Sequence, residues 1–372
     1  MRIGVPREIK VEEGRVGLTP ASVAELTHHG HQVWVETAAG EASGHTDEEY
    51  RRAGASVVDT PEEVFEAAEL IVKVKEPLAP ERALLRPHHV LFTYLHLAAD
   101  RPQADDLLAS GATAIAYETV VDERGTLPLL TPMSQVAGRL AVQEGAHHLT
   151  EPAGGTGLLL GGVPGVPPAK VVVIGGGVVG RNAVAMALGL GADVTVLDRD
   201  LHVLDELENV YGAALTTRYA SRAATAEEVV AANLVIGAVL VRGAKAPKLV
   251  TAEMVKQMRR GSVIVDVAID QGGCVETAHP TTHADPTFVV DGVVHYCVAN
   301  MPGAVPRTST DALNNATLPY VLAIADKGVQ AALADDPGLL EGLTVWRGHI
   351  THPVVAHELG LPHTPAREAL AA

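Results

Sequence analysis

The feature that most constrains this chain is a run of β-branched residues that leads directly into a glycine-rich turn. Residues 170–174 read Lys-Val-Val-Val-Ile, and the next six residues read Gly-Gly-Gly-Val-Val-Gly. An Ala-rich stretch typical of a helix follows, and a second apolar run ends at Asp198. This order of strand, glycine turn, helix, strand and acid is typical of a dinucleotide-binding βαβ unit.

The three glycines of the Gly-x-Gly-x-x-Gly pattern in this turn each have a predicted task. Gly175 permits the tight turn, Gly177 lets the backbone approach a pyrophosphate, and Gly180 allows the helix to pack closely on the strand. The helix start directs N–H groups and the positive end of its dipole at the phosphates. Asp198 is expected to accept a hydrogen bond from the adenosine ribose and to repel a 2′-phosphate, which favours NAD over NADP as the cofactor.

Short Val/Ile/Leu runs alternate with helix-like segments along the chain, and this rhythm predicts a mainly parallel α/β architecture. Strands are expected at residues 2–6, 32–36, 56–59, 70–74, 90–94, 113–117, 170–174, 193–197, 213–217, 233–238, 262–268, 287–290 and 295–299. Helices are expected at residues 20–30, 133–149 and 318–333, and an irregular tail that contains Trp346 follows the last of them. Thr19 is the expected N-cap of the first helix, with Pro20 at its first position.

We therefore predict an α/β protein of two Rossmann-like domains with a cleft between them, the second being a dinucleotide-binding Rossmann fold. Residues 1–128 and 307–372 form a discontinuous substrate domain in this prediction, and residues 129–306 form the NAD-binding domain.

Composition excludes several classes of function. The formal net charge is −17, and aromatic residues make up 3% of the chain. Both values argue against a nucleic-acid partner, because such proteins need basic patches and often stacking platforms. The two cysteines, Cys274 and Cys297, are too few to staple a secreted protein of this size. Apolar stretches are interrupted well before about 20 residues, so we expect no membrane partner and a cytoplasmic location.

Four ionisable side chains lie at or near the ends of expected strands. Lys75 and His96 follow the runs at 70–74 and 90–94, Asp270 follows a run that ends at 269, and Arg15 lies after the first strand. Ligands of open α/β sheets bind beyond the carboxyl ends of the strands. If the two domains face each other, all four side chains converge beside the nicotinamide ring.

The four side chains are suited to a small substrate that carries a carboxylate. Arg15 and Lys75 are cations suited to a carboxylate. His96 offers an imidazole, the side-chain type most often used to exchange a proton with a carbonyl or amine. Asp270 is suited to hold a water or a developing ammonium. The set predicts hydride transfer from a carbon next to a carboxylate, although each residue taken alone is more often a solvated charge or a hydrogen-bonded core residue.

No metal site is predicted. His279 and His283 have the spacing of helical metal ligands, but Pro280 and the neighbouring threonines indicate a loop.

Several blocks of the sequence resemble one known family over essentially all 372 residues. They are residues 1–10, 15–20, 72–77, 92–97, 266–274 and 296–302. The chain resembles the alanine dehydrogenase/transhydrogenase α-subunit family. The resemblance implies NAD-dependent, reversible oxidative deamination of L-alanine to pyruvate and ammonia, an activity of amino-acid catabolism, in a homohexamer.

The resemblance also implies roles for residues. Arg15, Lys75 and Asn300 correspond to substrate-binding positions, and His96 and Asp270 to acid/base positions. The residues at positions that hold NAD are Ser134, Gly175, Gly177, Val178, Val179, Gly180, Asp198, Val239, Leu240, Val267, Ala268, Ile269, Asp270, Val298, Asn300 and Met301. The sequence leaves open whether Asp270 or His96 activates the water. It also leaves open two other functions: the hydride-transferring NAD-binding subunit of a transhydrogenase, and a non-catalytic NAD sensor.

Overall fold

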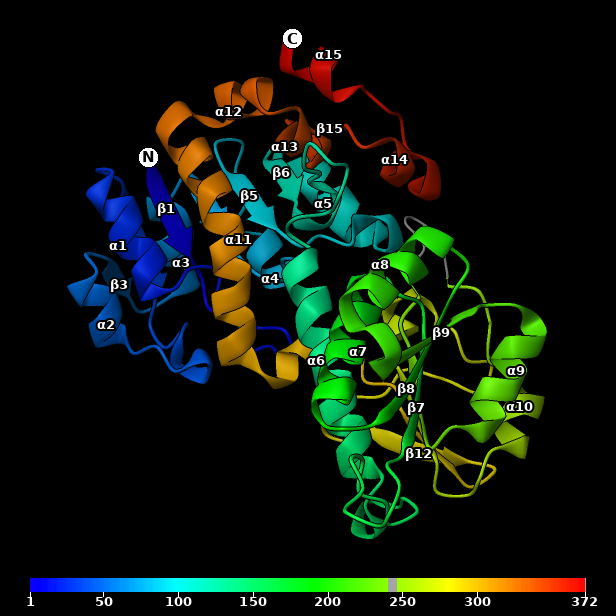
Figure 1. Cartoon of the computed structure of the whole chain (residues 1–372). Helices are drawn as coiled ribbons and strands as arrows, with labels where there is room; N and C mark the ends of the chain where they lie inside the picture. Colours follow the sequence, from blue (N-terminus) through cyan, green and yellow to red (C-terminus); the bar gives the residue numbers. More distant parts are fainter. Residues whose placement is uncertain (240–245, 372) are drawn as a thin grey trace. The chain divides into compact units, whose positions relative to one another are not determined.

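The computed structural model describes residues 1–239 and 246–371 (Figure 1). The chain divides into two compact units, Met1–Met133 with Val305–Ala372, and Ser134–Ala304. Each unit is built on its own parallel-dominated sheet, so the predicted pair of Rossmann-like α/β domains is confirmed. The predicted boundaries at 128/129 and 306/307, with substrate assigned to one domain and NAD to the other, stay a prediction.

Unit 1 contains, among its described residues, an eight-stranded sheet in the order β15-β14-β6-β5-β4-β1-β2-β3. Its strands are β1 (Arg2–Val5), β2 (Gln32–Glu36), β3 (Ser56–Val58), β4 (Leu70–Val72), β5 (Val90–Thr93), β6 (Thr113–Ala116), β14 (Leu343–Trp346) and β15 (His349–Ile350). Strands β1 to β6 pair in parallel, whereas β14 runs antiparallel to β6. The parallel strands are nearly continuous apolar runs because helices cover both faces of such a sheet.

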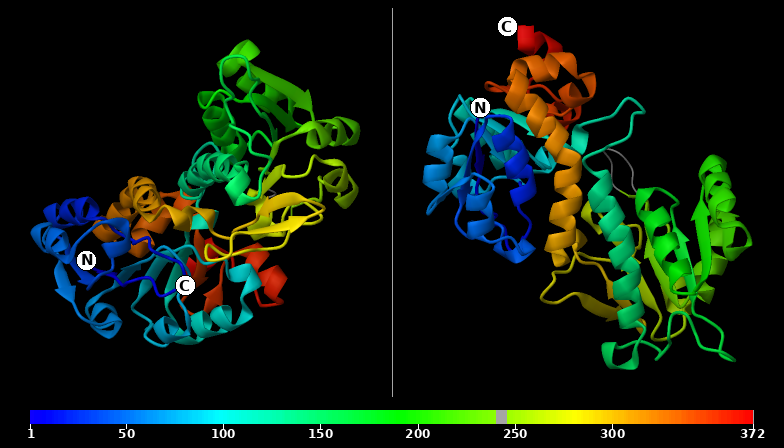
Figure 2. Two further views of the ribbon diagram at one scale, coloured as in Figure 1. Left: turned by 90° about the horizontal axis from the view of Figure 1, so that it is seen from below. Right: turned by 60° about the vertical axis from the view of Figure 1, so that its left-hand side comes forward.

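The helices of unit 1 lie between its strands along the chain and in the C-terminal segment that follows residue 305. They are α1 (Pro20–His28), α2 (Asp47–Arg52), α3 (Pro61–Ala67), α4 (Ala79–Arg82), α5 (Arg101–Ser110), α11 (Pro306–Lys327), α12 (Val329–Asp335), α13 (Pro337–Glu341), α14 (Pro353–Leu359) and α15 (Ala366–Ala371). Helix α1 begins as predicted, since the Thr19 side chain accepts a hydrogen bond from the Ser22 backbone N–H. Helix α11, drawn in orange, packs against α1 (Figure 2).

Unit 2 has a seven-stranded sheet within its described part, in the order β12-β13-β11-β10-β7-β8-β9. The strands are β7 (Lys170–Ile174), β8 (Asp193–Asp198), β9 (Leu215–Tyr219), β10 (Leu234–Gly237), β11 (Val263–Asp266), β12 (Thr287–Val290) and β13 (Val293–Tyr296). The helices are α7 (Val178–Gly189), α8 (Leu201–Tyr211), α9 (Arg222–Ala231) and α10 (Ala252–Gln257). Helix α6 (Thr131–His148) begins two residues before the predicted start of the long helix and enters this unit.

The sheet of unit 2 is covered on both faces. Helices α7 and α8 lie on one side of β7 and β8, and α9 and α10 lie on the other (Figure 1). Alternate residues of the central strands, such as Val172, Val235 and Ile264, join Val229 and Val255 in one apolar core. The reversal of strand order between β7 and β10 places the glycine turn after β7 where ligands of doubly wound sheets bind.

Two expectations for the last third of the chain are wrong. Residues 318–333 do not form one helix, because Gly328, with φ of +80°, separates α11 from α12. The tail is not irregular either, since Trp346 ends the buried strand β14, and β15, α14 and α15 follow. The antiparallel pairing of β14 with β6 is a contact between distant segments, which explains why the local sequence did not reveal it.

The strand expected at 295–299 is displaced. Strand β13 spans Val293–Tyr296 and pairs antiparallel with β12 across Asp291 and Gly292, both of which have positive φ. An Asp-Gly pair between two apolar runs is a strong hairpin signal, and it sets this register.

Within the described residues, no helix is both long enough and apolar enough to cross a bilayer.

Candidate active site

The glycine turn between β7 and α7 can be built only with glycine at two of its positions. Gly175 has φ of +99°, and a Cβ there would lie 2.7 Å from the carbonyl oxygen of Ala238. A Cβ at Gly180 would lie 1.8 Å from the carbonyl oxygen of Gly175. The first position therefore requires the left-handed backbone, and the second requires the close approach of helix to turn.

Gly177 differs from these two glycines. It is the N-cap of α7 with φ of −68° and ψ of −162°, a conformation open to any residue, and no heavy atom lies within 4 Å of a Cβ built there. The space at the start of this twelve-residue helix is therefore open. A pyrophosphate fits such a place, because the first-turn N–H groups and the helix dipole attract it.

Asp198 ends β8 and holds the same turn from the next strand. Its Oδ2 accepts a hydrogen bond of 2.6 Å from the Gly176 N–H, and its Oδ1 accepts one of 2.9 Å from the Asp200 N–H. The carboxylate thus shapes the glycine turn, a task that the sequence pattern did not reveal. A carboxylate has about four acceptor sites, so these bonds leave capacity for a ribose hydroxyl.

The other residues assigned to NAD offer backbone atoms and apolar surface. Val178 is exposed, and those that are half-buried are Ser134, Val179, Val239 and Val267. Those with buried side chains are Ala268, Ile269, Val298 and Met301. Leu240 lies outside the described residues.

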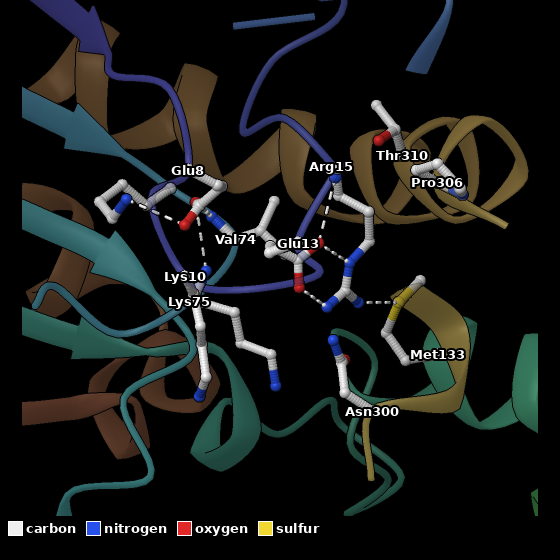
Figure 3. Close-up of polar contacts among 12 residues, drawn as sticks. Glu8, Lys10, Glu13, Arg15, Val74, Lys75, Met133, Asn300, Pro306 and Thr310 are labelled. Atoms are coloured by element: carbon white, nitrogen blue, oxygen red, sulfur yellow. Dashed lines mark hydrogen bonds and ion pairs between the residues drawn. The ribbon is translucent and has the colours of Figure 1, made fainter. Parts of the chain in front are cut away.

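Arg15, in the loop between β1 and α1, is held by a bidentate ion pair (Figure 3). Its Nε donates to Glu13 Oε1 at 2.6 Å, a second guanidinium nitrogen donates to Glu13 Oε2, and Nη1 lies 3.0 Å from Met133 Sδ. The Arg15 residue is 2% exposed. Desolvation lowers the pKa of Arg15, but the hydrogen bonds and charge of Glu13 outweigh it and raise the pKa overall. The guanidinium is therefore charged and fixed in orientation.

The two lysines after β4 have different environments. Lys73 is fully buried and pairs with Glu8 at 3.0 Å and with Glu81 at 2.7 Å. Lys75 is half-buried, and its backbone N–H donates to Glu8 Oε1 at 3.3 Å. The Val74 N–H donates to the same oxygen at 2.6 Å. Glu8 therefore fixes the backbone from which the Lys75 side chain projects (Figure 3).

His96 lies three residues after β5 in a left-handed conformation, with φ of +48°. Its backbone N–H donates to Glu118 Oε1 at 2.6 Å, and the exposed imidazole stacks on Tyr94 at a centroid distance of 5.9 Å. The Tyr94 hydroxyl donates to the carbonyl oxygen of Leu129. A non-glycine residue with positive φ persists where surrounding contacts determine it, and such strain is often found at functional sites.

Asp270 does not directly follow a strand. Strand β11 ends at Asp266, which is buried and accepts hydrogen bonds from the backbone N–H groups of Ala268, Cys274 and Val275. Burial raises the pKa of Asp266. Asp270 is exposed in the following 3-10 turn, where it accepts a hydrogen bond of 3.3 Å from the Asn300 N–H. Of the two acids, Asp266 supports the loop and Asp270 faces solvent.

Each unit assembles its own share of the predicted residues. In unit 1, Arg15 and Lys75 lie in one region with Glu8 and Glu13 (Figure 3). In unit 2, the glycine turn adjoins Asp198, and Asp270 adjoins Asn300.

The acidic residues that hold these groups were not predicted from the sequence. They are Glu8, Glu13 and Glu118. Glu8 stands within the resembling block 1–10, and Glu13 lies two residues before Arg15, so both positions were an available signal. Glu118 gave none, because it lies 22 residues from His96.

The two halves of the chain match two domain descriptions of one family. Residues 4–137 match "Alanine dehydrogenase/PNT, N-terminal domain", and residues 141–353 match "Alanine dehydrogenase/PNT, C-terminal domain". The chain is 55% identical to an alanine dehydrogenase of Mycolicibacterium smegmatis over 100% of both chains. It is 57% identical to that of Bacillus subtilis, over 100% of this chain and 98% of the relative.

Solved structures agree with these sequence matches. An L-alanine dehydrogenase structure superimposes with a TM-score of 0.94 and 54% identity, covering 97% of this chain and 99% of the other. A transhydrogenase from Sinorhizobium meliloti superimposes with a TM-score of 0.81 and 26% identity, covering 95% and 99%. The agreement in both domains and along the whole length leads to one conclusion. The chain belongs to the alanine dehydrogenase/PNT family.

Proposed function

We propose that this chain is an NAD-dependent alanine dehydrogenase that catalyses the reversible oxidative deamination of L-alanine to pyruvate and ammonia. The observation that carries the proposal is the buried Arg15, oriented by Glu13, in a chain that matches alanine dehydrogenases from end to end. A fixed guanidinium suits a small substrate with one carboxylate.

We assign the cofactor to unit 2 and the substrate carboxylate to unit 1. The open space at Gly177 and the carboxylate of Asp198 support NAD binding at the start of α7. When bound, NAD supplies the hydride acceptor, C4 of its nicotinamide ring. Arg15 and Lys75 hold the substrate carboxylate in this proposal, so that Cα–H is oriented for transfer.

His96 and Asp270 carry the proton transfers in the proposed mechanism. Hydride transfer requires a neutral amine on the substrate, and the later addition of water and loss of ammonia each move a proton. The exposed imidazole of His96, stacked on Tyr94, is in a position to exchange protons with solvent. Asp270, anchored by the Asn300 N–H, is the second candidate for activating the water.

Replacing Gly177 with alanine is expected to weaken NAD binding about tenfold or more, because the methyl group would occupy the space proposed for the pyrophosphate. The melting temperature should fall by no more than the modest cost of alanine at a helix N-cap, since nothing lies within 4 Å of that methyl and the backbone is unstrained. Fluorescence titration with NADH measures the dissociation constant.

Gly189→Ala is the matched control at the other end of the same helix. No heavy atom lies within 4 Å of a Cβ there either. This variant should bind NAD normally. Equal affinities of the Gly177→Ala variant and wild type would contradict the assigned pyrophosphate position.

Replacing Asp198 with alanine is expected to weaken NAD binding more than NADP binding, because the carboxylate that repels a 2′-phosphate is removed. The ratio of the two dissociation constants is the quantity to measure. Asp200→Ala is the control, since Asp200 caps α8 through the His202 N–H and has no assigned cofactor contact. An unchanged NAD/NADP ratio in the Asp198 variant would show that the ribose contact is misassigned.

One assay tests the proposed function as a whole. NADH formation from L-alanine at alkaline pH is compared with formation from serine and glycine, and with hydride exchange from NADPH to an NAD analogue. Turnover with L-alanine is the expected result. Exchange without any turnover of L-alanine would instead favour a transhydrogenase subunit. Light scattering of the same preparation tests the homohexamer that the family resemblance implies.

A further inference from the structure

Three potential metal ligands meet at the surface of unit 1, outside the residues discussed so far. His29 Nδ1 lies 3.2 Å from Asp326 Oδ2, and His31 Nε2 lies 2.8 Å from Asp326 Oδ1. The three ligand atoms all lie within 4.8 Å of one another. Within residues 1–239 and 246–371, His29, His31 and Asp326 are the group of three or more His, Cys, Asp or Glu side chains whose ligand atoms lie this close together.

The three side chains come from segments that the fold brings together. His29 is the C-cap of α1, His31 lies just before β2, and Asp326 lies in the last turn of α11. The carbonyl ends of two helices therefore lie at this place, and their dipoles favour a cation. Glu25 adds a further negative charge, with its Oε1 3.6 Å from His29 Nε2.

The three side chains differ in their exposure to solvent, and a second contact orients the His31 ring. The exposed fractions of the His29, His31 and Asp326 side chains are 36%, 7% and 41%. Nδ1 of His31 lies 3.2 Å from the amino group of Met1, so Nε2 is the nitrogen directed at Asp326. Metal-binding histidines are commonly oriented by such a partner on the second ring nitrogen.

We propose that His29 Nδ1, His31 Nε2 and the Asp326 carboxylate form a binding site for a divalent transition metal ion, with Zn²⁺ as the foremost candidate. Ligands about 2.0–2.1 Å from a tetrahedral zinc are roughly 3.3 Å apart. The two nitrogen–oxygen distances of 2.8 and 3.2 Å are near this value, so small rotations of the side chains admit the ion.

The type of ligand selects the class of ion. Two imidazole nitrogens and one carboxylate suit Zn²⁺, Cu²⁺ or Ni²⁺, whereas Mg²⁺ and Ca²⁺ require mostly oxygen ligands. With three protein ligands, at least one coordination position is left for water. Because the ligands join the end of α11 to the junction of α1 and β2, bound metal is expected to stabilise unit 1.

A network of hydrogen bonds without a metal is the alternative role of these residues. The effect of desolvation on the pKa of Asp326 is outweighed by the hydrogen bonds from His31 and His29, which lower that pKa. Such a network also orders the segment. The two roles differ in one respect, since only a metal site gives saturable binding with nitrogen ligands.

The test uses the untagged full-length chain, freed of metal by chelation. Calorimetric titration with Zn²⁺ is expected to give one site per chain, and the melting temperature should rise with Zn²⁺ concentration. The electron paramagnetic resonance spectrum of one equivalent of Cu²⁺ should show coupling to two nitrogen nuclei.

His31→Gln and Asp326→Asn are expected to weaken Zn²⁺ binding about tenfold or more, and His31→Gln should remove one nitrogen from the Cu²⁺ spectrum. His28→Gln is the matched control, because His28 is an exposed neighbour that is not part of the cluster. His29→Gln, at a more exposed position, replaces His31→Gln if that variant does not fold. Unchanged Zn²⁺ affinity and Cu²⁺ coupling in these variants would overturn the proposal and leave adventitious binding.

Discussion

Replacing His96 with alanine is expected to lower kcat about 10²–10⁴-fold, the range that general acid–base catalysis contributes. The NAD dissociation constant should not change, because none of the contacts assigned to the cofactor is made by His96. Steady-state NADH formation from L-alanine measures the first quantity, and NADH fluorescence titration measures the second.

His96→Asn is the control for backbone strain in this experiment. Asparagine tolerates the positive φ of +48° that this position requires, but it has no group that titrates near neutrality. Both variants should therefore lose turnover, while the asparagine variant keeps the wild-type melting temperature more closely. A near-normal kcat in the asparagine variant would remove His96 from the proposed mechanism.

Replacing Lys73 with methionine is expected to lower the free energy of unfolding by about 3–5 kcal/mol, since removing one partner leaves buried charges uncompensated. Glu8 and Glu81 both pair with Lys73, and the side chains of all three residues are at most 3% exposed. Urea denaturation followed by circular dichroism measures the change.

Lys10→Met provides the comparison, because Lys10 also pairs with a glutamate, Glu76, but its side chain is 39% exposed. An exposed ion pair contributes only about 0–1 kcal/mol. Equal losses in the two variants would show that burial does not determine the cost at Lys73.

The effect of Lys73→Met should also depend on pH. Burial raises the pKa of Glu8 above its usual value, and the charge of Lys73 opposes that rise. Without Lys73 the folded-state pKa of Glu8 rises further. Protonation of Glu8 then stabilises the folded variant at low pH, and the variant loses stability as pH increases through the raised pKa. The difference in unfolding free energy between wild type and variant should be smaller at about pH 5 than at about pH 8, a window above the ordinary glutamate pKa of about 4.3. A constant difference across this range would contradict the role given to Glu8.

The glycine turn shows how far local sequence determines structure. Strand β7 begins and ends where predicted, and Gly175 and Gly180 have the backbone constraints expected of them. These properties depend on steric limits within a few residues, so the pattern 175–180 is sufficient to predict them.

The region after Pro306 shows the opposite case. Strand β14 exists because it pairs with β6, more than 200 residues earlier in the chain, and no local pattern indicated that pairing. The break at Gly328 was visible in the sequence as a glycine, but a single glycine within a helical pattern is often tolerated.

In the candidate site, too, some features follow from local sequence and others from the tertiary structure. The sequence by itself determined the two-unit α/β architecture, the glycine turn and the cationic, imidazole and carboxylate side chains near strand ends, because strand and helix periodicity and turn sterics are local properties. Only the tertiary structure decided which acid holds each of these groups: Glu13 for Arg15, Glu8 for the backbone at Lys75 and Glu118 for the backbone at His96. It also decided that Lys73 is buried while Lys75 is not. The physical reason is that burial and ion pairing depend on the distance between groups in space, and for most of these contacts the partners are 22 to 67 residues apart along the chain.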